Sequence, residues 1–249
     1  MVGEERNAES RTVAFFSVDR TGTLWSGKNF GEQWWTGIET VHRGVLFLHG
    51  FATPDLPGRK GITAVDSRTG DLLWQNAGLT FVASSGNGVY ALQDGPVEPV
   101  VAEFDHRTGA RIREIGRGSD AVRQVPRDGD LPENVEYPQV LLDDDASPLS
   151  AIVRKISAPA PPERSVEYGE HGPFLVIVHD RGNAPGPDGR TSYTRVLDVL
   201  ERATGNPAMH VTIETSVTTP AFGTFLVQGD MLYFVRQARS LTAVDLRQM

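Results

Sequence analysis

The chain contains no cysteine among its 249 residues. This absence excludes a disulfide framework, a thiolate metal site and a cysteine nucleophile, although it does not identify the compartment. Long apolar runs are also missing, since no stretch approaches the roughly 18 apolar residues that a membrane-spanning helix needs. Basic runs are lacking and the formal net charge is -8. We therefore expect no membrane span and no nucleic-acid partner.

The N-terminus has the sequence "MVGEERNAESRT", in which no apolar stretch follows a basic region. It does not resemble a signal peptide, so we expect a polar tail over 1–11 and a cytoplasmic location, or a periplasmic one if a leader has been removed. Hydrophobic residues make up 39% of the chain, enough for a packed core. The length is compatible with one all-β domain over 12–249, and we expect a monomer.

Helical periodicity is nearly absent from the sequence. Short runs rich in Val, Phe, Leu, Ile and Thr alternate with Gly, Pro, Asn and Asp, which predicts an all-β fold of many short strands. The predicted strands include "GVLFLHG", "LSAIVRKI", "PFLVIVHD" and "YTRVLDVLE". About sixteen such runs are too many for one small barrel.

One pattern recurs along the chain. "AVDSRTGDLLW" is matched by "AEFDHRTGARIREI" and "LDVLERATGNPAMHVTI", by the shorter "FSVDRTGTLW", and by "SLTAVDLRQM", which ends before a turn glycine. The pattern predicts a hairpin in which an acidic residue caps backbone N–H groups and Gly takes a positive φ. The Trp that follows the turn is expected to pack inward as part of a blade. The structural residues predicted from this pattern are Asp66, Thr69, Gly70, Trp74, Asp105, Gly109, Gly205 and Asp245.

The turn glycines at 22, 70, 109 and 205 are 48, 39 and 96 residues apart, so a degenerate copy is expected near 157. Units of about 40 to 50 residues with several short strands predict propeller blades. We predict a single β-propeller of about five four-stranded blades, with six as the alternative. The segment from Val13 to Trp25 should complete the blade that begins near Thr218, so that pairing of the two termini closes the ring.

The copy "ITAVDSRTGDLLWQ" resembles the repeat of the quinoprotein-like (PQQ-like) β-propellers, in which Ala-x-Asp ends a strand, Thr-Gly makes a turn and Trp anchors the next strand. The resemblance implies a propeller fold, related in kind to WD40-like propellers, and a small uncharacterised bacterial family. It does not imply a quinone, because the catalytic quinoproteins carry an adjacent cysteine pair that this chain lacks. We expect no cofactor.

Acidic clusters raise two alternatives. Asp143, Asp144 and Asp145 could supply oxygen ligands to Ca²⁺, but no EF-hand spacing surrounds them and a solvated turn is the favoured interpretation. A second hypothesis is a glycosidase-like carbohydrate-active enzyme, whose carboxylates at the central channel would be drawn from Asp143, Asp145, Glu167 and Asp180.

The binding residues predicted from the sequence are histidines and aromatics. His49 and His179 end apolar strands, and His179 next to Asp180 could act as a base, although two polar strand ends are the simpler interpretation. Phe30, Trp34 and Trp35 could form an exposed platform or wedge two blades together, and the wedge is favoured. No catalytic residue and no metal ligand is assigned. The favoured function is a non-enzymatic scaffold or binding module for a protein or a small ligand.

Overall fold

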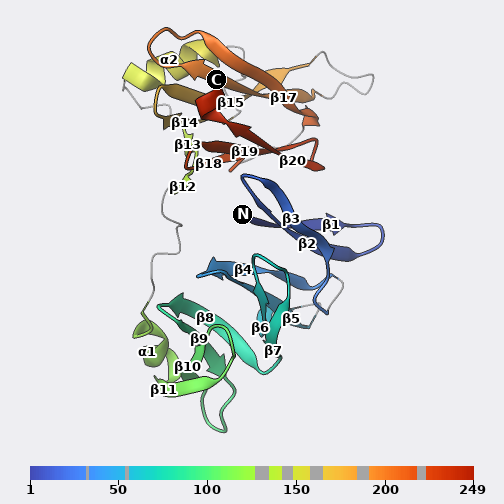
Figure 1. Cartoon of the computed structure of the whole chain (residues 1–249), viewed down its shortest axis with the longest axis vertical. Helices are drawn as coiled ribbons and strands as arrows, with labels where there is room; N and C mark the ends of the chain where they lie inside the picture. The colour runs from blue at the N-terminus through green and yellow to red at the C-terminus, as the bar shows by residue number, and fades with distance from the viewer. Residues whose placement is uncertain are drawn as a thin grey trace. The chain divides into compact units, whose positions relative to one another are not determined.

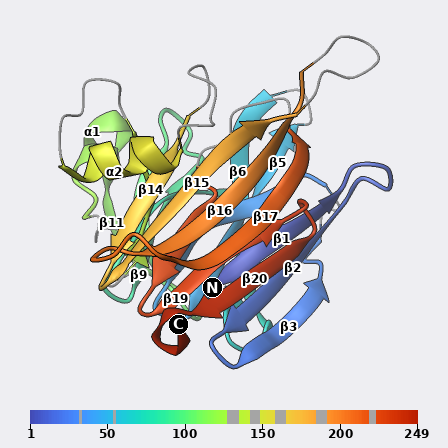
Figure 2. The same cartoon turned by 90° about the horizontal axis from the view of Figure 1, so that it is seen from above.

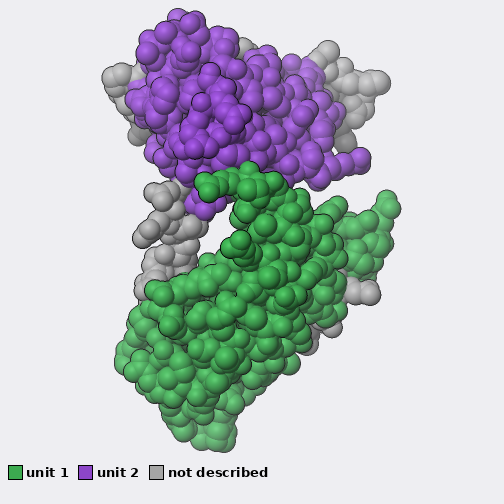
Figure 3. Space-filling model, viewed as in Figure 1, with its two compact units in different colours: residues 1–130 green, residues 131–249 purple. Residues whose placement is uncertain are grey.

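A computed structural model describes residues 1–31, 34–53, 56–126, 135–141, 148–157, 165–183, 191–217 and 223–249 of the chain. The chain divides into two compact units, residues 1–130 and residues 131–249 (Figure 3). Each unit is described by itself below. The organisation of the whole as one domain stays a prediction.

The described residues of unit 1 form three antiparallel sheets whose strands are neighbours in chain order (Figure 1). Sheet I is β1 (Val2–Asn7), β2 (Thr12–Asp19) and β3 (Gly22–Lys28). Sheet II is β4 (Thr36–His42), β5 (Val45–Thr53), β6 (Leu56–Asp66) and β7 (Leu72–Asn76). Sheet III is β8 (Leu79–Ser85), β9 (Gly88–Gln93), β10 (Val100–Asp105) and β11 (Arg111–Arg117), followed by helix α1 (Gly118–Arg123).

In unit 2, the part of the chain that the structure describes forms two sheets and two helical segments. Sheet IV is β13 (Gln139–Val140), β14 (Glu167–His171), β15 (Phe174–Gly182), β16 (Tyr193–Glu201) and β17 (Pro207–Val217). Sheet V is β12 (Val135–Glu136), β18 (Phe225–Gln228), β19 (Met231–Arg236) and β20 (Ser240–Asp245). Helix α2 (Pro148–Ile156) precedes β14, and a 3₁₀ turn (Leu246–Gln248) ends the chain.

The five sheets that the described residues form confirm the predicted all-β class and are consistent with a propeller of about five blades. Sheets II, III and IV each contain a four-stranded antiparallel meander, as a blade does. The pairings differ from the predicted ones at the termini. Among the described residues, β2 pairs with β1 and with β3, and none of these three strands pairs with the last strands, while sheet V is completed by β12, beside β18. Ring closure stays a prediction.

The N-terminal residues differ from the expected polar tail because Val2–Asn7 pair along β2 in a regular antiparallel register. Polar side chains on this strand suit a sheet edge, where only one side of the backbone is bonded to a neighbour. Three of the six residues of β1 are therefore charged, and their composition alone does not indicate a strand.

The core explains the uninterrupted apolar runs of the sequence. Alternate residues of a strand point to opposite faces of its sheet. Along β5, Val45 and Phe47 belong to the core between sheets II and III, whereas Leu46 and Leu48 belong to the core between sheets I and II. All four are at most 1% exposed, so this strand is covered on both faces.

Residues 148–156 form a helix where the sequence predicted a strand, so the predicted degenerate copy near 157 is wrong in this segment. The reason is a spacing of three and four residues between Leu149, Ile152, Val153 and Ile156, which places them along one side of a helix. Val153 is fully buried in a core with Leu175, Ile177 and Leu200 of sheet IV. Figure 2 shows α2 next to β14.

The repeated turns share one hydrogen-bond pattern in sheets II, III and IV. Gly70 N donates to Asp66 O, Gly109 N donates to Asp105 O, and Gly205 N donates to Glu201 O, at 2.7 to 2.9 Å. The three glycines have φ values of 69°, 69° and 71°. Glycine is favoured here because a side chain is strained at positive φ. We call these segments the Thr-Gly turns of sheets II (66–71), III (105–110) and IV (201–206).

Candidate functional site

The Thr-Gly turn of sheet II is covered by a tryptophan from the preceding sheet. The ring of Trp25, on β3, lies so close to Gly70 that a Cβ added there would be 2.8 Å from Trp25 Cδ2. Trp25 Nε1 donates to Ser67 O at 3.0 Å. Lys28 Nζ lies 5.9 Å from the Trp25 ring centroid and donates to Gly70 O at 2.6 Å. An indole ring, its N–H and an ammonium group together cover this turn.

Sheet III repeats the arrangement. The ring of Trp74, on β7, lies against the turn so closely that a Cβ at Gly109 would be 2.7 Å from Trp74 Cδ2. Trp74 Nε1 donates to His106 O at 3.0 Å. His106 follows the acidic residue of its turn just as Ser67 does. The Trp after each turn therefore packs onto the next sheet, and its N–H binds the same carbonyl position each time.

The Thr-Gly turn of sheet IV is built in the same way but carries no ring. Nothing among the described atoms lies within 4 Å of a Cβ built at Gly205. The carbonyl that corresponds to those of Ser67 and His106 is that of Arg202, and no described donor reaches it. On β11, four residues after Gly109, the position of the tryptophan is taken by Arg113, which pairs with Glu103 at 2.6 Å.

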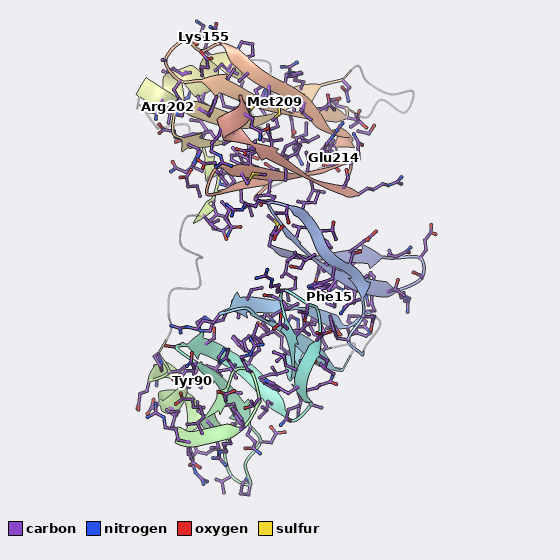
Figure 4. The ribbon with its side chains drawn as sticks, viewed as in Figure 1. Phe15, Tyr90, Lys155, Arg202, Met209 and Glu214 are labelled. Atoms are coloured by element: carbon purple, nitrogen blue, oxygen red, sulfur yellow. The ribbon has the colours of Figure 1, made fainter. Side chains whose placement is uncertain are left out.

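This bare turn lines a cavity of about 1030 Å³ beside helix α2, which we call the α2 pocket. Its apolar residues come from α2 and from the face of sheet IV that α2 covers. Figure 4 labels Lys155 and Arg202, which come from α2 and from the turn. The lining residues are Leu149, Ile152, Lys155, Ile156, Glu170, Gly172, Pro173, Leu175, Leu200, Glu201, Arg202, Ala203, Thr204 and Gly205.

The charged groups of the α2 pocket differ in their partners. Arg202 Nη2 pairs with Glu170 Oε2 at 2.5 Å. Glu201 Oε2 accepts a hydrogen bond from Thr204 Oγ1 at 2.8 Å. Lys155 is exposed, and within the described parts of the chain its ammonium group has no ion-pair partner. A ligand in this cavity would meet an apolar floor and one unpaired cation.

A second polar cluster lies on the α2-facing side of sheet IV. His179 Nε2 and His210 Nδ1 contact the two oxygens of Asp198 at 3.1 and 2.5 Å. Burial raises the pKa of the Asp198 carboxyl, but the hydrogen bonds from His179 and His210 outweigh it and hold that pKa below its usual value. His179 is 1% exposed and its Nδ1 has no partner among the described atoms.

The carboxylate that orients His179 is thus Asp198 and not the adjacent Asp180. Neighbouring residues on a strand point to opposite faces, so His179 and Asp180 cannot form the predicted pair. Asp180 instead binds Arg195 through both oxygens, at 2.8 and 3.2 Å, with both residues buried. Sequence reasoning missed Asp198 and Arg195, although their place in the apolar run "YTRVLDVLE" is the signal for buried charges that need partners.

Glu167, the other described carboxylate named for the glycosidase hypothesis, caps a loop. It is 2% exposed and accepts hydrogen bonds from Gly223 N at 2.5 Å, Thr224 N at 3.1 Å and the Thr224 hydroxyl. These contacts favour a structural role. Asp143, Asp144 and Asp145 lie outside the described residues. Within the described parts, no group of three or more acidic or histidine side chains could hold a metal ion.

The predicted binding residues of unit 1 lie in different surroundings. Phe30 packs with Phe15 and Trp25 in the core between sheets I and II. Trp34 lies under the Arg6 guanidinium at 5.4 Å, and Trp35, 36% exposed, contacts Phe51 edge to face. The three aromatics therefore do not share one platform.

His49 is 7% exposed and close to an acidic residue that the sequence did not single out. His49 Nδ1 lies 3.1 Å from Glu39 Oε1, and Arg59 Nη1 contacts the other oxygen of Glu39 at 2.9 Å. The imidazole also meets the Phe51 ring. A ligand-binding role for His49, His179 and the aromatics stays a prediction.

Asp245 begins a further copy of the turn. Leu246 N donates to Asp230 O, as Ser67 N donates to Gly44 O, and Arg247 N donates to Asp245 Oδ1 at 3.0 Å. Met209, four residues after Gly205, packs on the core that contains Leu246. In unit 2 a methionine therefore stands where Trp74 stands in unit 1.

Comparison with known proteins gives a family match for part of the chain. A family model described as "Domain of unknown function (DUF4905)" matches residues 1–74. No curated protein matches. No helix among the described residues is long and apolar enough to span a membrane.

Two solved structures are similar to the chain at low identity. A europium-containing methanol dehydrogenase is 14% identical, with a TM-score of 0.31, and the match covers 99% of this chain and 47% of that one. The quinohemoprotein alcohol dehydrogenase ADHIIG from Pseudomonas putida HK5 is 15% identical, with a TM-score of 0.27 and coverage of 98% and 40%. This chain spans less than half the length of either enzyme. The fold assignment above rests on sheet topology and on the repeated turns.

Proposed function

We propose that this chain is a non-enzymatic binding module whose ligand is a small molecule held in the α2 pocket. The observation that carries the proposal is the bare Thr-Gly turn of sheet IV at the wall of a cavity of about 1030 Å³. Small-molecule sites typically have volumes of about 300 to 1,000 Å³ and apolar linings with a few polar groups. The α2 pocket has this volume and this composition.

The contacts of the acidic residues support binding over catalysis. A glycosidase needs two carboxylates that face a substrate. Asp180 is engaged by Arg195, Asp198 by two histidines, and Glu167 by two backbone amides and a hydroxyl. Each of these groups is largely buried and has a structural partner, so none is available to a sugar without breaking a buried contact.

The test is a titration of the whole chain with a set of small aromatic and aliphatic fragments, followed through backbone amide shifts by NMR. We expect shift changes that saturate at Leu149, Ile152 and Gly205. Ile152→Trp should place a bulky ring at the wall of the cavity and weaken binding, because Ile152 lines it and is 42% exposed. Ala151→Trp is the matched control, since Ala151 is an exposed α2 residue outside the lining. Equal loss in both variants, or no saturable shift at these residues, contradicts the proposal.

A further inference from the structure

The geometry of the repeated turns points to the chemical class of the ligand: we propose that the α2 pocket binds an indole-type molecule, a planar aromatic ring that carries an N–H donor. This inference rests on the proposed function and specifies its ligand. It follows from what the two equivalent turns of the same chain already hold.

The ring requirement comes from the glycines. At Gly70 and Gly109 the space that a Cβ would take is filled by the faces of Trp25 and Trp74. The backbone at Gly205 has the same φ and the same hydrogen bonds, yet no atom of the described residues lies within 4 Å of a Cβ built there. Because glycine has no Cβ, a flat ring can approach it more closely than it can approach any other residue. The turn of sheet IV therefore presents the same flat surface, and no side chain that the structure describes occupies it.

The donor requirement comes from the carbonyl groups. Both indole N–H groups donate to the carbonyl of the residue after the acidic residue, at 3.0 Å in each turn. The corresponding carbonyl belongs to Arg202, which lines the α2 pocket. Arg202 N donates to Pro173 O just as Ser67 N donates to Gly44 O, so Arg202 occupies the same position in its turn as Ser67 does. A ring without an N–H leaves this acceptor unpaired inside the cavity.

Lys155 in the α2 pocket corresponds to Lys28 at the turn of sheet II. There the Lys28 ammonium accompanies the Trp25 ring at 5.9 Å. In the α2 pocket, Lys155 lines the same cavity as Gly205 and has no ion-pair partner within the described parts of the chain. Cations are attracted to the electron-rich face of an indole. The pocket thus holds the two elements that both rings contact, a glycine face and a carbonyl acceptor, and also the cation that accompanies Trp25.

The closing experiment compares indole with N-methylindole by calorimetry on the whole chain. The two rings have nearly the same shape, but only indole can donate to Arg202 O. We expect indole to bind about fivefold more tightly, the factor that a net hydrogen bond of about 1 kcal/mol gives. Equal affinities overturn the inference. If aliphatic fragments saturate the pocket and indole shows no preference over them, the inference fails while the proposed function stands.

Two variants locate the ring. Gly205→Ala places a Cβ on the proposed ring position and should weaken indole at least tenfold. Gly229→Ala is its control, because Gly229 also has positive φ and open space but lies outside the pocket. Lys155→Gln should weaken indole about threefold, whereas Arg239→Gln, which removes a cation elsewhere in unit 2, should not. Equal effects of a variant and its control contradict the assignment.

A final arm identifies the source of the ring. N-acetyltryptophanamide carries the same indole on a peptide backbone. We expect it to bind more weakly than free indole, because its two amide groups must be desolvated against the apolar residues of α2 and sheet IV that line the pocket. Tighter binding than indole would assign the site to a tryptophan of another polypeptide and overturn the small-molecule inference.

Discussion

The Thr-Gly turns of units 1 and 2 share their backbone and differ in what covers them. In unit 1 the turns of sheets II and III each hold a tryptophan ring. In unit 2 the turn of sheet IV holds no ring from the described part of the chain and forms part of a cavity. The turn of sheet IV keeps the backbone conformation of the other two, and its glycine N–H and threonine hydroxyl both donate to the acidic residue. The turns differ in the side chain that covers them, and a turn without such a side chain can form part of a binding site.

The largest expected effect comes from removing a ring that is present. Trp74→Ala should lower the free energy of unfolding by about 3 kcal/mol, because the ring packs on Phe47, Gly109 and the core between sheets II and III. Chemical denaturation followed by circular dichroism measures this. Leu72→Ala on the same strand is the control, since Leu72 is 54% exposed. Similar losses in both variants would show that the ring does not join the sheets.

A matched pair of glycine variants separates a covered turn from a bare one. Gly109→Ala should cost about 3 kcal/mol, because positive φ strains any side chain and the new Cβ also displaces the Trp74 ring. Gly205→Ala should cost only about 1 kcal/mol, from the φ strain alone. Denaturation of both variants in parallel gives the difference. Equal losses would mean that the turn of sheet IV is covered as well.

Met209 tests whether unit 2 uses a methionine in place of a tryptophan. Met209→Ala should destabilise the protein by about 1 to 2 kcal/mol, because Met209 is partly buried against the core that contains Leu246. Val235→Ala, at a position 50% exposed, provides the baseline. A Met209→Ala loss no larger than this baseline would separate unit 2 from the packing scheme of unit 1.

The smallest expected effect concerns the acidic residue of a turn. The Thr108 hydroxyl, which donates to Asp105 Oδ1 at 2.9 Å, is the main cause that lowers the pKa of Asp105 below its usual value. Thr108→Val should raise this pKa, as carbonyl-carbon NMR titration would show. A carboxyl with a lowered pKa in the fold contributes stability above its unfolded pKa of about 4, and this stability is lost as the pH falls through the folded pKa. The variant should therefore lose less stability on acidification than the natural protein.

The control for this titration is Thr69→Val in the turn of sheet II. There the main cause that lowers the pKa of Asp66 is the hydrogen bond from the Arg107 guanidinium, at 2.8 Å. Thr69→Val should leave the pKa of Asp66 nearly unchanged. A rise equal to that of Asp105 would contradict the assignment of partners.

The fold could be predicted from the sequence wherever a pattern depends on local chemistry. Acidic residue, threonine and glycine specify a turn by their own hydrogen bonds and φ preference, so the copies at 66, 105 and 201 were recognisable. The runs of Val, Leu and Ile predicted strands, and most of these runs are strands. Helix α2 was missed because its apolar spacing was judged by composition, in which Ile and Val favour a strand.

The candidate site could not be predicted in the same way, because it depends on which surfaces meet. Nothing in "ERATGNPAMH" distinguishes a bare turn from a covered one. The signal lies elsewhere, in Arg113 at the position where Trp74 stands in the preceding copy. The lack of a tryptophan at position 113 can be interpreted only with the structure, in which Trp25 and Trp74 each pack on the following turn. The partners of His179 and Asp180 could likewise be identified only from the structure, which shows which face of sheet IV each side chain lies on.

The most direct test of the account is the contact between a bound ring and the bare turn. Intermolecular nuclear Overhauser effects would be measured between indole ring protons and the assigned protons of the natural protein. The account predicts cross-peaks to the Gly205 α-protons and the Ile152 methyl groups. Saturable indole binding with cross-peaks only to other residues, or no saturable binding, would contradict the assignment of the Thr-Gly turn of sheet IV as a ligand site.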